Sequence, residues 1–233
     1  MTDHEKILEI IRQKDLIPIA LDLHTTALLI VDVQRYFVSP HDPLMQTFET
    51  LVPGVTTEYC ARVNSRVVPN ISRLQRCFRA QALPIIYTAI GTCTTDGRDL
   101  NQMWKDLDQL SVHTIGKRMF PAVGEPSWHI DERIAPHPGE LVVNKTSSGT
   151  FNSTMLDQTL RNMGIQSLII GGVTTDVCVE TTARDAADRG FQVIIVEDAC
   201  TAFSDTLHQS ALQAFSLAFG RVRTTDDVLR LLS

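Results

Sequence analysis

Residues 167–190, SLIIGGVTTDVCVETTARDAADRG, contain the change of pattern that decides the fold. An apolar run, Ser167 to Val173, is followed by the short turn TTDV and then by a helix-like segment, Cys178 to Arg189. Continuous apolar runs are typical of strands that are buried on both faces of a parallel sheet. Gly190 stands where the C-cap of that helix belongs. The stretch therefore predicts a strand, a tight turn and a helix, with Cys178 at the turn.

The rest of the chain repeats the alternation of strand-like and helix-like segments. Because such alternation favours parallel strands joined by right-handed helical crossovers, we expect an α/β fold. Its architecture would be three-layer αβα, around a doubly wound, mostly parallel, six-stranded sheet of the Rossmann-like kind. The other predicted strands are Thr26–Val31, Leu83–Ala89, Leu141–Asn144, Phe191–Val196 and Arg221–Arg223, and the other predicted helices are Val67–Gln81, Asn101–Leu110, Thr154–Met163 and Leu207–Phe219.

The composition limits the classes of protein to consider. With 233 residues, of which 43% are hydrophobic, the chain is expected to form a single domain, 1–233, with a helical N-terminal extension at 1–24. The net charge of -6 and the lack of a dense basic run argue against nucleic acid and membrane as partners. No apolar stretch reaches the ~20 residues that span a bilayer. Five irregularly spaced cysteines favour free thiols in a reducing cytoplasm.

Two proline-containing stretches break the alternation and are predicted to be long loops. They run from Ser39 to Glu58 and from Arg118 to Gly139. Loops of this length usually cover a site or an interface, although either could be a plain surface excursion. Apolar side chains in the second loop and in the N-terminal helix favour a homodimer or homotetramer, unless they fold back on their own subunit. These side chains are Phe120, Val123, Trp128 and Ile130 in the loop and Ile7, Leu8, Ile10 and Ile11 in the helix.

Three reactive side chains stand at the ends of predicted strands. Asp32 closes the first strand, Lys145 follows the third and Cys178 follows the fourth. In an open α/β sheet with the strand order 3-2-1-4, these ends lie close together where ligands bind. A thiol near a helix N-terminus is expected to have a lowered pKa and to form thiolate near neutral pH. Taken singly, the three could be a helix cap, a solvated lysine and a small buried residue; together they suggest nucleophilic catalysis.

Three local motifs resemble those of the isochorismatase-like cysteine hydrolases. They are LLIVDVQRYF at 28–37, VVNKTSSGTFNST at 142–154 and GGVTTDVCVETTARDAADRGF at 171–191. The resemblance extends from about Thr26 to the C-terminus, and the third motif is highly specific.

The resemblance implies a role for each reactive side chain. Asp32 would be the general base, Lys145 the catalytic lysine and Cys178 the nucleophile. A non-proline cis peptide bond would join Val173 and Thr174. Its effect would be to aim the N–H groups of Thr174 and Cys178 at the oxyanion of a tetrahedral intermediate.

The family has three branches, which differ in chemistry. Nicotinamidase-like members hold zinc with an aspartate and two histidines, but residues 87–100, YTAIGTCTTDGRDL, contain no histidine, so we expect no metal and no other cofactor. Isochorismatases that hydrolyse a vinyl ether need no thiol and often have glycine in its place. The third branch, which includes N-carbamoylsarcosine amidase and biuret hydrolase, fits Cys178 best. We therefore expect cleavage of a linear amide or a ureido (carbamoyl) C–N bond in a small molecule.

Two other functions stay open at this stage. DVQRYFV and FGRVRTTDDVL are isochorismatase-like in detail, so the chain could be a vinyl-ether hydrolase with an idle cysteine. It could also be a non-catalytic binding protein that keeps the fold. The intact set of Asp32, Lys145 and Cys178 weighs against this last interpretation.

Several further side chains are candidates for lining the substrate pocket. Each also has a plain structural interpretation, which is core packing for the aromatic side chains and turn chemistry for the hydroxyls. The candidates are Gln34, Tyr36 and Phe37 after the first strand, Trp104 on a helix, and Ser148, Thr150 and Phe151 after Lys145.

Overall fold

The computed structural model describes residues 1–232 and has one six-stranded sheet at its centre. All strand pairs are parallel, and the order is β3-β2-β1-β4-β5-β6. The strands are β1 Thr26–Val31, β2 Ile85–Ile90, β3 Leu141–Lys145, β4 Ser167–Val173, β5 Gln192–Thr201 and β6 Arg221–Arg223. The order reverses between β1 and β4, which is where a doubly wound sheet opens a crevice for ligands. The predicted fold class and strand order are confirmed.

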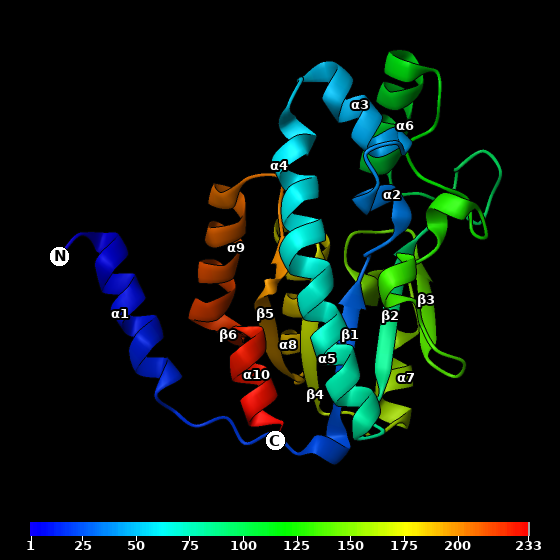
Figure 1. The fold of residues 1–233 in the computed structure, drawn as a ribbon. Coiled ribbons are helices and arrows are strands. Elements are labelled where there is room, and N and C mark those ends of the chain that lie inside the picture. Colours follow the sequence, from blue (N-terminus) through cyan, green and yellow to red (C-terminus); the bar gives the residue numbers. More distant parts are fainter. Residues whose placement is uncertain (233) are drawn as a thin grey trace.

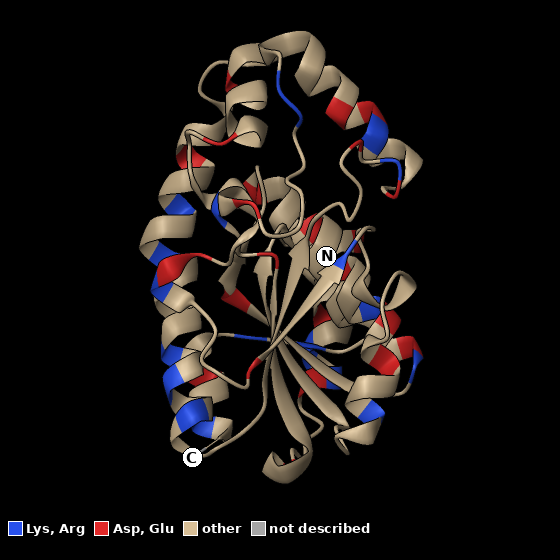
Figure 2. Ribbon diagram, turned by 90° about the vertical axis from the view of Figure 1, so that its right-hand side faces the viewer, with Lys and Arg blue, Asp and Glu red and all other residues tan. Residues whose placement is uncertain are grey.

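Helices cover both faces of the sheet (Figure 1). On one face lie α5 Val68–Ala80 and α10 Thr225–Leu231, which also pack against each other. On the other lie α7 Leu156–Asn162 and α8 Glu180–Asp188, with α9 Asp205–Ala218 packed beside α8. The central strands β1, β2 and β4 are buried along their whole length, as strands between two helical layers must be. Lys and Arg are interspersed with Asp and Glu along the outer helices in the view of Figure 2.

The stretch from Ser39 to Glu58 is helical, so the prediction of a long loop there is wrong. It contains α3 Pro43–Leu51 and the start of α4 Val55–Arg62. Pro43 stands at the start of α3, where a missing N–H costs nothing, so this proline begins a helix instead of breaking one. Gly54 makes the turn between the two helices with a φ of 90°.

A long bent helix connects this region to the core. Through the π-helical turn Val63–Val67, α4 continues into α5. Pro69 lies two residues after the end of that turn, at the second position of α5. Because proline cannot donate a backbone hydrogen bond, the widened turn lets the chain pass from α4 to α5 without a regular helical bond at that point.

A cap of helices and turns lies over the carboxyl ends of the strands (Figure 1). It consists of α2 Arg35–Val38, α3, α6 Gln102–Ile115 and the segment from Arg118 to Gly139. That segment is irregular as predicted, with short 3-10 turns at Pro126–Trp128 and Glu132–Ile134. Its apolar side chains fold back on their own subunit: Phe120 and Ile130 are buried, Trp128 packs on the core, and Val123 alone of the four is exposed. They therefore give no support to an oligomer, contrary to the expectation.

The N-terminal helix α1, Asp3–Asp15, forms as predicted and stands off the body (Figure 1). None of its residues is buried, and Ile10 is 54% exposed. Its C-terminal end is held by Lys14 Nζ, which donates to the carbonyls of Ser216 and Gly220, and by Asp15, which pairs with Arg221 and Arg223. No helix within residues 1–232 has the length and apolar character to cross a membrane.

Candidate active site

The structure brings the three reactive side chains together at the carboxyl edge of the sheet. Lys145 Nζ lies 2.8 Å from Asp32 Oδ2, and Cys178 interacts with both side chains. All three are buried, with Cys178 2% exposed and the other two 0% exposed. A carboxylate, an ammonium and a thiol in contact away from water form a set that can move a proton and stabilise a charged nucleophile.

Each charged member of this set is held in place by a neighbour. Asp32 Oδ1 accepts a hydrogen bond of 2.6 Å from Thr88 Oγ1 on β2. Lys145 Nζ donates to the carbonyl oxygens of Ser147 and Ser148, both at 2.9 Å. The loop after β3 therefore turns its backbone towards the lysine. Trp104 on α6 adds a cation–π contact, with its ring centre 5.4 Å from Lys145 Nζ.

The thiol of Cys178 is protonated at rest, which corrects the expectation of a preformed thiolate. Burial raises its pKa, and Asp32 adds to the rise, whereas Lys145 opposes it. The helix N-terminus was expected to lower the thiol pKa, but burial has the larger effect, because removing a thiolate from water raises its free energy. For Lys145, burial acts to lower the pKa, but the charge of Asp32 and the hydrogen bonds with Asp32 and Cys178 outweigh it, so the pKa is raised and the amine stays protonated.

The backbone around the site adopts conformations that the sequence motifs accommodate. Asp32 has a φ of 54°, in the left-handed region that aspartate and asparagine tolerate better than most residues. Gly172 has a φ of 133°, and a Cβ there would lie 2.1 Å from the carbonyl oxygen of Val31. The peptide bond between Val173 and Thr174 is cis. Cys178 follows in the π-helical turn Thr175–Val179, which leads into α8.

Two of the predicted pocket aromatics, Tyr36 and Trp104, lie at the site. Tyr36 is fully buried and interacts electrostatically with Asp32 and Cys178. Trp104 stacks on Phe120, with 5.0 Å between ring centres, and Phe120 contacts Tyr36 edge-on. Phe37 packs on Tyr36 at 4.3 Å. These rings, all carried by the cap, form an aromatic wall beside the triad.

The other predicted pocket residues have partners inside the protein. The Gln34 side-chain amide donates to the backbone carbonyls of Ile90 and Trp128 and accepts from the Ile90 N–H. It therefore ties β2 to the cap. Ser148 contributes its carbonyl to Lys145. Thr150 and Phe151 point their side chains to the layer of α8: Thr150 Oγ1 lies 3.1 Å from Thr182 Oγ1, and the ring of Phe151 lies 6.1 Å from that of Phe191. Their side chains brace the walls of the site.

Sequence reasoning missed Tyr59 and His208. Tyr59 on α4 is fully buried and interacts electrostatically with Cys178, and its hydroxyl has no hydrogen-bond partner among residues 1–232. The helical spacing of Thr56, Tyr59, Val63 and Val67 was the available signal, hidden by the expectation of a loop. His208 on α9 is 4% exposed, and its Nδ1 lies 2.8 Å from Thr175 Oγ1 at the start of the turn that carries Cys178.

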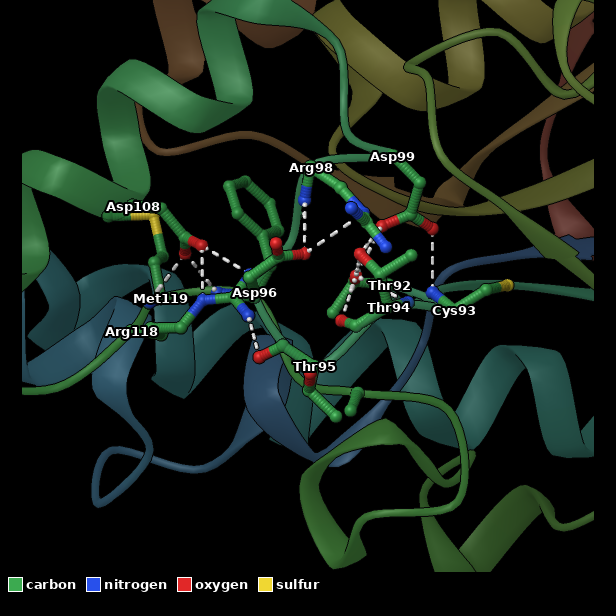
Figure 3. A network of polar contacts seen from close by, with 12 residues as sticks. Thr92, Cys93, Thr94, Thr95, Asp96, Arg98, Asp99, Asp108, Arg118 and Met119 are labelled. Atoms are coloured by element: carbon green, nitrogen blue, oxygen red, sulfur yellow. Dashed lines mark hydrogen bonds and ion pairs between the residues drawn. The ribbon is translucent and has the colours of Figure 1, made fainter.

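The loop after β2, where a zinc site would stand, is held by its own hydrogen bonds (Figure 3). Asp99 accepts from Thr92 Oγ1, Thr94 Oγ1 and the Cys93 N–H, at 2.5, 2.7 and 2.6 Å. Partial burial works against these bonds, yet they lower the pKa of Asp99 to about 2. Across residues 1–232, no three His, Cys, Asp or Glu side chains gather as metal ligands would.

A second anchor in Figure 3 fixes the cap next to this loop. Asp108 on α6 pairs with Arg118, whose Nε lies 2.6 Å from Oδ2, and accepts from the N–H groups of Met119 and Phe120, both at 2.9 Å. Arg118 also donates to the Thr95 carbonyl. The aromatic wall at Phe120 is thereby fixed to α6.

Comparison with known proteins gives the family. The model of the isochorismatase domain matches residues 26–227, which is most of the chain. The chain belongs to the isochorismatase family. Among curated relatives of this isochorismatase-family hydrolase, ureidoacrylate amidohydrolase RutB of Methylobacterium radiotolerans is 30% identical over 213 residues, covering 88% of this chain and 78% of that protein. N-carbamoylsarcosine amidase of Arthrobacter sp is 30% identical over 207 residues, covering 88% of this chain and 70% of that protein.

Solved structures support the same assignment. A cysteine hydrolase from Pseudomonas syringae pv. phaseolicola 1448A matches this isochorismatase-family hydrolase with a TM-score of 0.74 and 26% identity, over 92% of this chain and 95% of that chain. The resemblance inferred from the motifs is confirmed, and with it the class of hydrolase whose relatives are named as amidohydrolases acting on C–N bonds.

Proposed function

We propose that the enzyme hydrolyses a linear amide or ureido C–N bond in a small molecule, through a thioester on Cys178. The observation that carries the proposal is the buried contact of Lys145 Nζ with Asp32 Oδ2 at 2.8 Å, with Cys178 interacting with both. The substrate class is supported by the relatives named for ureidoacrylate and carbamoylsarcosine. The five cysteines of the enzyme are free thiols, which suits a reducing compartment such as the cytoplasm.

In the first half of the reaction Asp32 takes the proton of Cys178 as Sγ attacks the substrate carbonyl carbon. The N–H groups of Thr174 and Cys178 would hold the resulting oxyanion. When the tetrahedral intermediate collapses, the C–N bond breaks and protonated Asp32 gives its proton to the departing amine or ammonia. In the second half a water attacks the thioester and Asp32 takes a proton from that water. The C–S bond then breaks, and Asp32 returns the proton to the departing thiolate, which restores the thiol and the carboxylate.

Lys145 supports both halves by its position. Its raised pKa keeps it positively charged, and the carbonyls of Ser147 and Ser148 fix its amine against Asp32. The charge stabilises thiolate when the proton moves to Asp32, which compensates for the dry surroundings that otherwise favour the thiol. The thiolate therefore forms during the reaction and not before it.

Ammonia release from a panel of amides, ureas and carbamoyl compounds tests this function, with and without prior alkylation by iodoacetamide. We expect release that alkylation of Cys178 abolishes. Cleavage of isochorismate with no response to the panel would instead identify a vinyl-ether hydrolase, in which the thiol has no task. Inertness towards both would identify a non-catalytic binding protein.

A further inference from the structure

His208 is a buried titratable side chain that the mechanism proposed above does not use. It lies in the first turn of α9 and is 4% exposed. Its Nδ1 lies 2.8 Å from Oγ1 of Thr175, which is 0% exposed. Because burying polar groups costs free energy unless they are hydrogen-bonded, these two side chains stabilise each other's position. The bond joins α9 to the first residue of the turn that carries Cys178.

The Thr175–His208 bond lies next to the backbone donors of the proposed oxyanion site. Thr175 directly follows Thr174 and begins the π-helical turn that contains Cys178. Within the turn, the carbonyl of Thr174 accepts from the N–H groups of Val177 and Val179, at 3.3 and 3.2 Å. These backbone bonds are internal to the turn. The side-chain bond from Thr175, in contrast, holds the turn against a separate helix.

The end of α9 that carries His208 is itself held in place. Ser204 caps the helix, and its Oγ accepts from the N–H of Leu207 at 3.2 Å. Directly before the cap, the ring of Phe203 stacks on Tyr59 of α4, with 4.3 Å between ring centres and 17° between planes. The imidazole is therefore a fixed point to which the turn can be attached.

The imidazole acts through its position and not through its charge. Burial lowers the pKa of His208 to about 4, and the charge of Arg66 adds to the effect. Near neutral pH the ring is therefore uncharged. The atom that it contacts is a threonine hydroxyl, which takes no part in the proposed bond changes. His208 is thus placed to hold the turn and not to carry a proton of the reaction.

We propose that His208 is a positioning residue for the oxyanion site: through Thr175 it holds the turn so that the N–H groups of Thr174 and Cys178 point to one oxygen. This role rests on the function proposed above and adds a residue to it. Because the bond acts on backbone donors, it affects those reactions of the thiol that pass through a tetrahedral oxyanion. A direct displacement by the same thiol should be unaffected.

Two reagents of similar size separate these two kinds of reaction at Cys178. With S-methyl thioacetate, Sγ attacks the carbonyl carbon and a tetrahedral oxyanion forms. The C–S bond to the methylthio group then breaks, and Asp32 passes the thiol proton to the departing methanethiolate. Iodoacetamide instead loses iodide as Sγ attacks its saturated carbon, and no oxyanion forms. Rapid quenching and mass spectrometry of the Cys178 peptide give both rate constants without any need for the natural substrate.

Removing either partner of the bond should slow acetylation alone. Thr175→Val removes the hydroxyl and keeps the shape of the side chain. We expect it to lower the acetylation rate constant by about tenfold, the effect of one hydrogen bond, and to leave alkylation within about twofold. His208→Leu should do the same. The double variant should lose no more than either single variant, since all three lack the same bond.

Two further variants serve as controls. Thr175→Ser keeps the hydroxyl and should restore acetylation. Thr26→Val also removes a buried hydroxyl, but Oγ1 of Thr26 donates to the Asp22 carbonyl at the opposite end of β1 from the site. Neither rate constant should change in Thr26→Val.

Acetylation as fast in Thr175→Val and His208→Leu as in the unaltered enzyme overturns the positioning role. An equal loss of acetylation and alkylation overturns it too, because a purely structural role would have that effect. Faster alkylation also overturns it, since it would show that the fold has opened around the thiol. If the unaltered enzyme is alkylated but not acetylated, or reacts with neither reagent, the thioester mechanism itself fails, and the positioning role fails with it.

Discussion

The ion pair of Asp32 and Lys145 joins strands that are not neighbours in the sheet. Asp32 follows β1 and Lys145 ends β3, with β2 between them. Thr88 on β2 donates to the other oxygen of the same carboxylate, so three strands converge on Asp32. Parallel pairing puts their carboxyl ends at one edge, which is why residues far apart in the sequence meet there.

Replacing the proposed nucleophile should abolish turnover while leaving the fold intact. Cys178→Ser removes a thiol that is buried but small, so we expect the melting temperature to stay within a few degrees and kcat to fall by orders of magnitude. Cys93→Ser, at an exposed cysteine, is the control and should keep full activity. Retention of more than about a tenth of the original kcat in Cys178→Ser would contradict covalent catalysis.

Asp32→Asn should slow the alkylation of Cys178 as well as turnover. Asparagine tolerates the left-handed backbone at φ 54°, so the change removes the proton acceptor and little else. The rate constant for iodoacetamide at neutral pH, read by mass spectrometry of the Cys178 peptide, is the measurement. We expect it to fall by about tenfold or more, because the thiol is protonated at rest and must give its proton to Asp32 as Sγ attacks. Faster labelling would show instead that the Asp32 charge, which raises the thiol pKa, matters more than its role as proton acceptor. Unchanged labelling with lost turnover would limit Asp32 to protonating the leaving group.

His208 should make the fold sensitive to mild acid. Burial lowers its pKa to about 4, helped by the charges of Arg66 and Arg62 and opposed by Asp205. The unfolded histidine titrates near 6.5, so the unfolded chain binds more protons and stability falls as the pH drops from about 6.5 towards 4. We expect the free energy of unfolding to fall by about 2 kcal/mol more in the native chain than in His208→Gln between pH 7 and pH 5. If denaturant titrations show the same loss of unfolding free energy in both chains, the prediction is wrong.

Activity should survive extensive dialysis against a chelator. Asp99, the carboxylate of the loop where a zinc site would stand, already accepts three hydrogen bonds from its own loop. We expect ammonia release to be unchanged after dialysis and unchanged again when zinc or manganese is added. Loss on dialysis with recovery on adding either metal would place the enzyme in the metal-dependent branch.

The chain should assemble into a dimer or tetramer through surfaces that include α1. Ile10 is 54% exposed and Ile7 38% exposed on a helix that has no buried residue in the single chain. Size exclusion with light scattering at micromolar concentration should give a multiple of 25.9 kDa, and Ile10→Glu should lower the mass. A mass near 25.9 kDa for the unaltered chain would refute assembly.

The sequence predicted the sheet and the triad because both depend on local pattern. Continuous apolar runs mark buried parallel strands, and the residues that close them share one edge of the sheet. The ends of elements were predicted less accurately. The strand β5 runs to Thr201, five residues beyond the predicted end at Val196. The prediction ended there because the charged residues Glu197 and Asp198 interrupt the apolar run.

Other features depend on three-dimensional surroundings that a sequence does not display. Pro43 was interpreted as a loop residue, although it begins a helix, so the helical spacing of Tyr59 went unnoticed. The turn at Cys178 was located correctly, but its burial, which raises the thiol pKa, results from the packing of distant segments and is not visible in the local sequence. Likewise, the sequence SSGTF at 147–151 does not indicate that the carbonyls of Ser147 and Ser148 accept hydrogen bonds from Lys145, or that the Phe151 ring packs near Phe191.

The burial of the triad bears on the fate of the acyl-enzyme. With Cys178 only 2% exposed, a thioester formed there is shielded from bulk solvent and from every nucleophile too large to pass the cap. Whether the thioester is hydrolysed or transfers its acyl group to an amine would then depend more on the size of the amine than on its concentration. Hydroxylamine, which is nearly as small as water, should divert part of the acyl group to a hydroxamate, whereas bulky amines of equal nucleophilicity should not. The cap would in this way make water the main acceptor of an acyl group that could otherwise be transferred to an amine.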